Sequence, residues 1–99
     1  MTTYKDIDAE IIQWADANAL KIYNRFADRE ARFCYISSND GECFQISIEP
    51  PHGISVKIHA WSIETRDDEE MHQEWLVPIT SVRPALDNAL AKLREWMAR

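Results

Sequence analysis

The sequence predicts an α+β fold in which two helices pack on one face of a four-stranded antiparallel sheet. Three observations support this: a helical apolar pattern at each end, alternating apolar and polar residues between them, and short turn sequences separating the alternating runs. Short connections favour a meander, so the expected order is α-β-β-β-β-α. We expect residues 1–99 to form a single domain, because a chain of this length has room for one core.

The first helix is predicted from about Thr3 to about Asp28. Thr3 and Asp6 have the spacing of a capping box, which satisfies free backbone N–H groups at a helix start. The stretch 16–19 is a weaker helix former and could hold a kink. The apolar residues at helical spacing are Tyr4, Ile7, Ile11, Ala15, Ile22 and Phe26.

A hairpin is predicted around Asp40-Gly41. Asp-Gly suits the positive φ angles of a two-residue type I′ turn. Opposed residue numbers would then sum to 81, so that Phe33 faces Ile48. In this register Phe33 and Tyr35 lie on the helix-covered face, as a half-buried sheet requires.

The two cysteines, Cys34 and Cys43, are expected on the opposite face of that hairpin. Four residues of strand would separate them by about 13 Å, which is too far for a disulfide. Neither lies near a helix start or a cluster of positive charge that would activate its thiol.

The third and fourth strands are delimited by turn sequences. Pro50–Gly53 cannot continue a central strand. The next strand begins at Ile54 with alternating apolar and polar residues. It is expected to pair with the preceding strand so that Ile54 lies opposite Ile48. Residues 71–77 alternate again, and Pro78 ends this fourth strand.

The second helix is predicted to follow Thr80 or Ser81, either of which can serve as its N-cap. Pro84 is tolerated in a first helical turn, where N–H groups lack partners. The stripe at helical spacing consists of Val82, Leu86, Ala89, Leu90, Leu93 and Met97.

The charge of the chain argues against nucleic acid as a partner. There are 11 Lys and Arg residues against 17 Asp and Glu residues, which gives a net charge of −6. Phosphate binding needs basic residues that displace counterions. The element order is similar to that of double-stranded-RNA-binding domains, but the last helix lacks their basic start. The charge instead favours a basic protein partner.

The location predicted from the sequence is the cytoplasm. No run of about 18 apolar residues is present, so we expect no membrane contact. The first six residues do not read as a secretory signal.

No catalytic, cofactor or metal site is predicted. Phosphate-binding glycine loops and the common hydrolase motifs do not occur. His59 and His72, with Glu74 or Glu64, could bind zinc, but the spacing fixes no third ligand. We therefore expect these histidines to be solvated residues of the sheet.

The predicted partner-binding surface combines an acidic segment with the sheet face away from the helices. Ile36, Trp61, Ile63 and Leu76 are expected on that face, unless a β-bulge near Ala60 turns Trp61 and Ile63 inward. The acidic segment could equally be a solvated hairpin tip. The predicted binding residues are Trp61, Glu64, Asp67, Asp68, Glu69, Glu70 and Glu74.

The stretches 39–42, 46–50 and 53–58 carry an Asp-Gly turn, an I-x-I-E strand and a G-x-S-V-x-I strand. Together they resemble small immunity proteins of bacterial polymorphic-toxin systems. That family often has Trp and His after the turn, where this chain has Cys43 and Phe44. The resemblance implies a bacterial protein that blocks a toxin by stoichiometric contact and performs no catalysis.

The sequence thus favours a non-enzymatic acidic module that binds a basic protein. Two alternatives remain open at this stage. The open sheet face could form a two-fold homodimer. A small molecule could occupy a pocket between the sheet and the helices, lined by Tyr23, Phe26, Tyr35 and Trp75.

Overall fold

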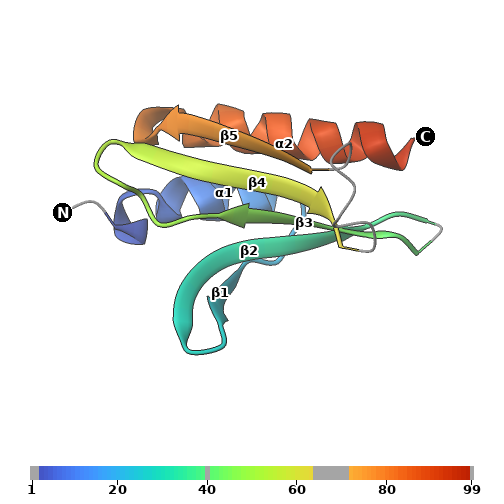
Figure 1. Cartoon of the computed structure of the whole chain (residues 1–99), viewed down its shortest axis with the longest axis horizontal. Coiled ribbons are helices and arrows are strands. Elements are labelled where there is room, and N and C mark those ends of the chain that lie inside the picture. Colours follow the sequence, from blue (N-terminus) through green and yellow to red (C-terminus); the bar gives the residue numbers. More distant parts are fainter. Residues whose placement is uncertain (1–2, 40, 64–71, 99) are drawn as a thin grey trace.

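Five strands form one antiparallel sheet in the order β1-β2-β3-β4-β5, and the fold belongs to the α+β class (Figure 1). The computed structural model describes residues 3–39, 41–63 and 72–98. The strands are β1 (Tyr23–Phe26), β2 (Arg29–Ser37), β3 (Cys43–Ile48), β4 (Ser55–Ser62) and β5 (His72–Pro78). The helical elements are η1 (Tyr4–Asp6), α1 (Asp8–Ala17), η3 (Ile79–Ser81) and α2 (Val82–Met97).

Both helices pack against the same face of the sheet. One core cluster joins the buried side chains of α1 and α2 to those of β2, β3 and β4. The residues that the sheet contributes all share one alternation phase, which defines the inner face: Cys34, Phe44, Ile46, Ile48, Val56, Ile58 and Ala60. The opposite side is called the outer face below.

The prediction of a single helix from Thr3 to Asp28 is wrong. The capping box at Thr3 is present, but it begins the short η1 turn, and α1 ends at Ala17. Asn18 closes the helix, and Ala19 adopts a positive φ of 56°, which an α-helix cannot accommodate. Residues 23–26 then form a fifth strand, so the four-stranded sheet predicted from the sequence is incomplete.

The hairpin between β2 and β3 has a three-residue loop, not the expected two-residue loop. The N–H of Ser38 donates to the carbonyl of Glu42 at 2.8 Å, which leaves residues 39–41 between them. Gly41 has a φ of 91°, as expected for the glycine that ends such a loop. Opposed numbers therefore sum to 80, as in the pair Cys34–Ile46.

That change of one residue reverses the faces of β2. Phe33 and Tyr35 lie on the outer face, and Cys34 is buried in the core. The expectation that both cysteines face outward is therefore wrong for Cys34. Both are free thiols, as the sequence predicts.

The pairing of β3 with β4 is shifted by four residues from the predicted register. Ile48 lies opposite Ile58, not opposite Ile54. The turn after β3 is longer than expected, because the N–H of His52 donates to the carbonyl of Ser55 and closes a local loop. An even shift preserves the faces, so the inward side chains predicted on β3 and those at Val56, Ile58 and Ala60 are confirmed. The expectation for Ile54 is wrong, because it precedes β4 and is 76% exposed.

The second helix agrees closely with the prediction. Its N-cap is Ser81, and its buried stripe is Val82, Ala85, Leu86, Ala89, Leu90, Leu93 and Trp96. Met97 is only partly buried. No helix in the described part of the chain has both the length and the apolar character that a bilayer span requires.

Candidate functional site

The outer face of the sheet carries two rows of side chains that run across the strands. Each row follows the register of the ladders, because directly opposed residues point to the same side. The first row is Phe33, Ser47, His59 and Glu74. The second row is Tyr35, Gln45, Trp61 and His72. In each row, the polar residue on β3 therefore lies between an aromatic ring on β2 and a ring on β4.

An aromatic cluster of Tyr23, Phe26, Phe33 and Tyr35 forms one side of this face. The ring of Tyr23 stacks on Phe33 with centroids 5.3 Å apart, and Phe26 and Tyr35 contact Phe33 edge-on. The pairing of β1 with β2 contains a bulge near Tyr23, and Figure 1 shows β2 strongly bent. The bend of the β1–β2 hairpin brings the four aromatic rings into contact.

The centre of the outer face is a groove. On β3, Gln45 and Ser47 have shorter side chains than the rings on either side, and the amide of Gln45 donates to the Ser47 hydroxyl at 3.0 Å. The resulting open depression has a volume of about 690 Å³. Its lining includes Phe26, Tyr35 and Trp61, so it is an aromatic-walled groove with a polar floor.

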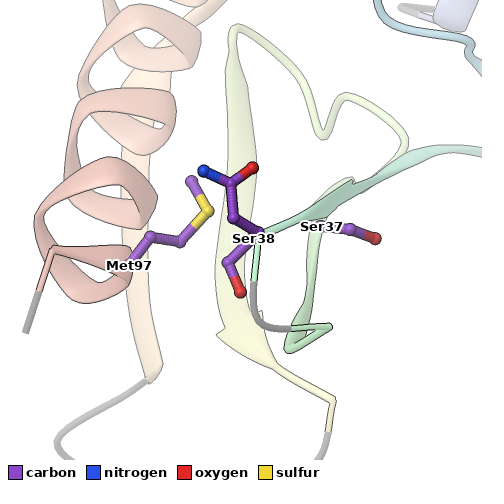
Figure 2. Close-up of a pocket in the computed structure, with 4 residues that line it drawn as sticks. Ser37, Ser38 and Met97 are labelled. Carbon is purple, nitrogen blue, oxygen red and sulfur yellow. The ribbon is translucent and has the colours of Figure 1, made fainter.

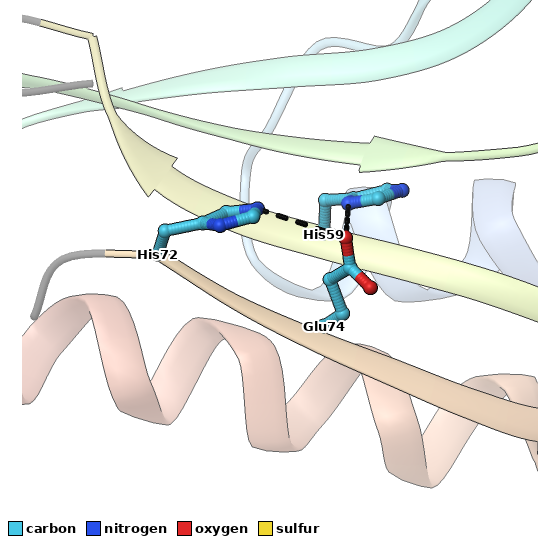
Figure 3. A group of neighbouring side chains, drawn as sticks. All are labelled: His59, His72 and Glu74. Carbon is cyan, nitrogen blue, oxygen red and sulfur yellow. Dashed lines mark ion pairs between the residues drawn. The ribbon is translucent and has the colours of Figure 1, made fainter. Parts of the chain in front are cut away.

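A histidine cluster of His59, His72 and Glu74 lies at the other side of the groove (Figure 3). Nδ1 of His59 is 3.2 Å from Oε1 of Glu74, and Nε2 of His72 is 3.9 Å from the same oxygen. Nε2 of His59 contacts the carboxylate of Glu49. The two imidazole rings are nearly parallel, with centroids 6.0 Å apart, and Trp61 meets both edge-on.

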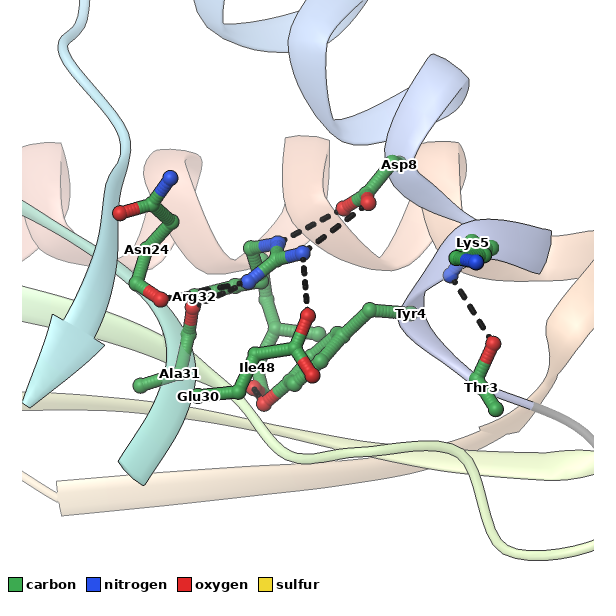
Figure 4. A network of polar contacts seen from close by, with 9 residues as sticks. All are labelled: Thr3, Tyr4, Lys5, Asp8, Asn24, Glu30, Ala31, Arg32 and Ile48. Carbon is green, nitrogen blue, oxygen red and sulfur yellow. Dashed lines mark hydrogen bonds and ion pairs between the residues drawn. The ribbon is translucent and has the colours of Figure 1, made fainter. Parts of the chain in front are cut away.

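A polar network attaches the start of the chain to the sheet (Figure 4). The guanidinium of Arg32 donates to both carboxylate oxygens of Asp8, at 2.7 and 3.0 Å, and lies over the ring of Tyr4. The Tyr4 hydroxyl donates to the carbonyl of Ile48 at 2.7 Å. Burial raises the pKa of Tyr4 to about 12. Glu30 also accepts from Arg32, so acidic partners offset this cation beside the groove.

A second hollow lies between the end of α2 and the β2–β3 hairpin (Figure 2). It measures about 320 Å³ and is lined by Ser37, Ser38, Asn39 and Met97. Among the described residues, its lining holds no charged side chain and no histidine or cysteine, so these residues offer little chemistry. The groove on the outer face is the stronger candidate site.

The structure places two of the predicted binding residues beside this groove. Trp61 lies on the outer face and is partly exposed, between the buried residues Ala60 and Ser62. Strict alternation through these positions means that the strand has no bulge there. Glu74 is on the same face. The remaining predicted residues lie outside the described part of the chain: Glu64, Asp67, Asp68, Glu69 and Glu70.

Other expectations for this face need correction. Ile36 packs against the core, because the register of β2 is reversed. Tyr23, Phe26 and Tyr35 were expected to line a pocket between the sheet and the helices, but they lie on the outer face. Trp75, the fourth residue expected in that pocket, packs against the core.

Sequence reasoning missed the aromatic cluster and the contact of Glu49 with His59. The aromatic residues of 23–26 could have been recognised as a strand, because Tyr23 and Phe26 are good strand formers flanked by a weak helical stretch. No local signal predicts the contact between Glu49 and His59, which depends on the register of β3 with β4.

Comparison with protein families, curated proteins and solved structures finds no match to this chain.

Proposed function

We propose that this protein is a non-enzymatic binding module whose outer sheet face holds a basic segment of a partner protein. The observation that carries the proposal is the aromatic-walled groove on a sheet face that the described helices leave uncovered. Fold alone does not specify function, so the argument depends on the side chains of this face.

The aromatic cluster exposes much of its apolar surface to solvent. Phe26 is 67% exposed, Tyr35 42% and Tyr23 38%. Contiguous exposed aromatic residues are typical of surfaces that bind proteins, whereas isolated exposed residues are common everywhere. Trp61 on the opposite wall is the type of residue that often dominates binding energy.

Charge indicates what kind of partner fits. The charged residues that line the groove are Arg29, Glu30, Arg32 and Glu49, and Arg32 is paired with Asp8 and Glu30. Glu74 lies in the adjacent hollow beside Trp61, and the carboxylates of Glu49 and Glu74 are 48% and 45% exposed. The chain as a whole carries a net charge of −6. An Arg or Lys side chain entering the groove near Trp61 would meet the Glu49 carboxylate and the faces of the aromatic rings, which attract cations. A second copy of this acidic chain would instead be repelled.

The most specific form of the proposal is a toxin-neutralising immunity protein of bacterial type, acting in the cytoplasm. Its support is the resemblance of the stretches 39–42, 46–50 and 53–58 to that family. In this role the protein would bind one toxin molecule and block it by contact. The partner would then be encoded in the neighbouring reading frame.

The test is affinity capture from the native host with purified wild-type protein and two variants. The first variant, F26A/Y35A/W61A, removes three aromatic side chains that line the groove. The second, I12S, replaces a side chain on α1 that is also exposed, far from the groove, and serves as the control. We expect a basic protein, captured in equal molar amount by wild type and I12S and lost with the triple variant.

Two results would contradict the proposal. One is a captured partner that binds the triple variant as well as it binds wild type. The other is a stable homodimer, detected by sedimentation at several protein concentrations, that the triple variant does not form. The outer face would then serve self-association and not the binding of a partner.

A further inference from the structure

We propose that His59, His72 and Glu74 form a binding site for one divalent transition-metal ion of the zinc class. This inference does not depend on the identity or existence of a protein partner. It rests on the geometry of the three side chains and on the contact of His59 with Glu49.

The sheet register brings the three groups together. His59 and Glu74 are directly opposed across β4 and β5, and His72 lies two residues before Glu74 on the same face. One ligand atom from each residue lies within 4.8 Å of the other two. Neighbouring strands hold all three side chains, so little ordering is needed for them to converge.

The distances suit a zinc ion. Zinc bonds to imidazole nitrogen and carboxylate oxygen of 2.0–2.1 Å place tetrahedral ligand atoms about 3.4 Å apart. The separations of 3.2 Å and 3.9 Å from Glu74 Oε1 to the two histidines lie on either side of this value. The ligand atoms of the two histidines lie within 4.8 Å of each other, so side-chain rotations would bring them closer when the site is filled.

The contact with Glu49 supplies an independent argument. A neutral His59 that donates from Nε2 to Glu49 directs the lone pair of Nδ1 towards the Glu74 carboxylate. In the metal-bound state, the ion would occupy the space between Nδ1 and the Glu74 carboxylate, while Nε2–H stays donated to Glu49. Metal-binding histidines commonly donate their other N–H to a carboxylate, which fixes the ring and the tautomer.

The ligand set also indicates the class of ion. Two imidazoles and one carboxylate suit zinc and neighbouring transition metals, whereas calcium and magnesium prefer sites made of oxygen. The cluster opens on the side of the sheet that faces solvent, where His72 is 42% exposed and Glu74 45%. A fourth position would therefore be accessible to water or to a side chain of another molecule.

The experiment is a titration of untagged, chelator-treated protein with zinc chloride, followed by isothermal titration calorimetry. Cobalt(II) replaces zinc in a parallel titration, because its absorption spectrum reports tetrahedral coordination. We expect one equivalent to bind wild type and binding to be lost in H59A, H72A and E74Q. The E49Q variant should bind about ten- to a hundred-fold more weakly.

The matched control is H52A, which removes an exposed histidine in the turn before β4 and should leave zinc affinity unchanged. Thermal unfolding in chelator shows whether each variant is folded. If H59A is not folded, H72A and E74Q decide the question, because their side chains are exposed. Absence of saturable one-to-one binding to wild type would overturn the site, as would equal affinity of wild type, H72A and E74Q.

Discussion

The ion pair between Arg32 and Asp8 is predicted to stabilise the fold more than a surface pair does. The pair is bidentate, and the side chains are only 11% and 29% exposed. Charge-assisted hydrogen bonds contribute about 1.5–3 kcal/mol each in favourable settings. Because Asp8 is partly solvated and Arg32 keeps Glu30 and the Ala31 carbonyl as acceptors, we expect a coupling energy of about 1.5 kcal/mol.

The assay is a double-mutant cycle of D8A and R32M, measured by urea unfolding and tryptophan fluorescence. Methionine keeps apolar contact with the Tyr4 ring when the guanidinium is removed. The control cycle uses Lys92 and Glu95, an exposed pair on α2 with a 3.4 Å separation and an expected coupling below about 0.5 kcal/mol. The reasoning is refuted if the two cycles give the same coupling energy.

Three further predictions concern buried groups and a turn. Burial raises the pKa of Cys34 to about 12, so its thiol should be unreactive at pH 8. Iodoacetamide should therefore modify only Cys43 in the folded protein and both cysteines in denaturant. Mass spectrometry of the digested protein measures this, and labelling of Cys34 before Cys43 would contradict it. Tyr4 keeps its proton up to a pKa of about 12 when folded and loses it near 10 when unfolded, so its contribution to the free energy of unfolding is complete below pH 10 and decreases between pH 10 and 12. Urea unfolding between pH 10 and 12 should show the free energy of unfolding falling less steeply for Y4F than for wild type. At pH 7, Y4F should be about 1 kcal/mol less stable, because it lacks the hydrogen bond to Ile48. Equal pH dependence for the two proteins would be evidence against a buried Tyr4. G41A should lose about 1 kcal/mol in the same assay, because alanine is strained at a φ of 91° although no atom blocks its Cβ, and an unchanged stability would contradict the assigned loop.

Much of the fold could be predicted because apolar periodicity is a local property. The stripe of α2 from Val82 to Leu93 and the alternation of β3 and β4 identify buried faces without knowledge of their partners. The α+β class and antiparallel connections follow from these patterns. The exception is residues 18–26, where Ile22 and Phe26 continue a helical spacing by coincidence and tertiary pairing with β2 decides the structure.

Register could not be predicted with the same certainty. The Asp40-Gly41 pair fits a two-residue turn, yet the chain uses three loop residues with Gly41 last, and this single residue reverses β2. The aromatic wall at Phe33 and Tyr35 is a direct consequence.

The histidine cluster depends on register as well. His59 and His72 are separated by a charged segment without a defined turn sequence, so no spacing rule brings them together. Only the pairing of β4 with β5 places His59 opposite Glu74. For Trp61, in contrast, the sequence left only one question open, whether a bulge near Ala60 turns it inward, and the regular alternation of β4 places it on the outer face.

The most direct test of the central claim is an NMR titration of ¹⁵N-labelled protein with the captured basic partner, observed at the tryptophan indole N–H signals. The chain has four tryptophans, and Trp61 is the one beside the groove, whereas Trp14 and Trp96 are buried in the core. A W61F variant assigns the Trp61 signal. We predict that this signal shifts to saturation at one equivalent while those of Trp14 and Trp96 stay in place. Saturated binding with an unchanged Trp61 signal would contradict a functional outer face.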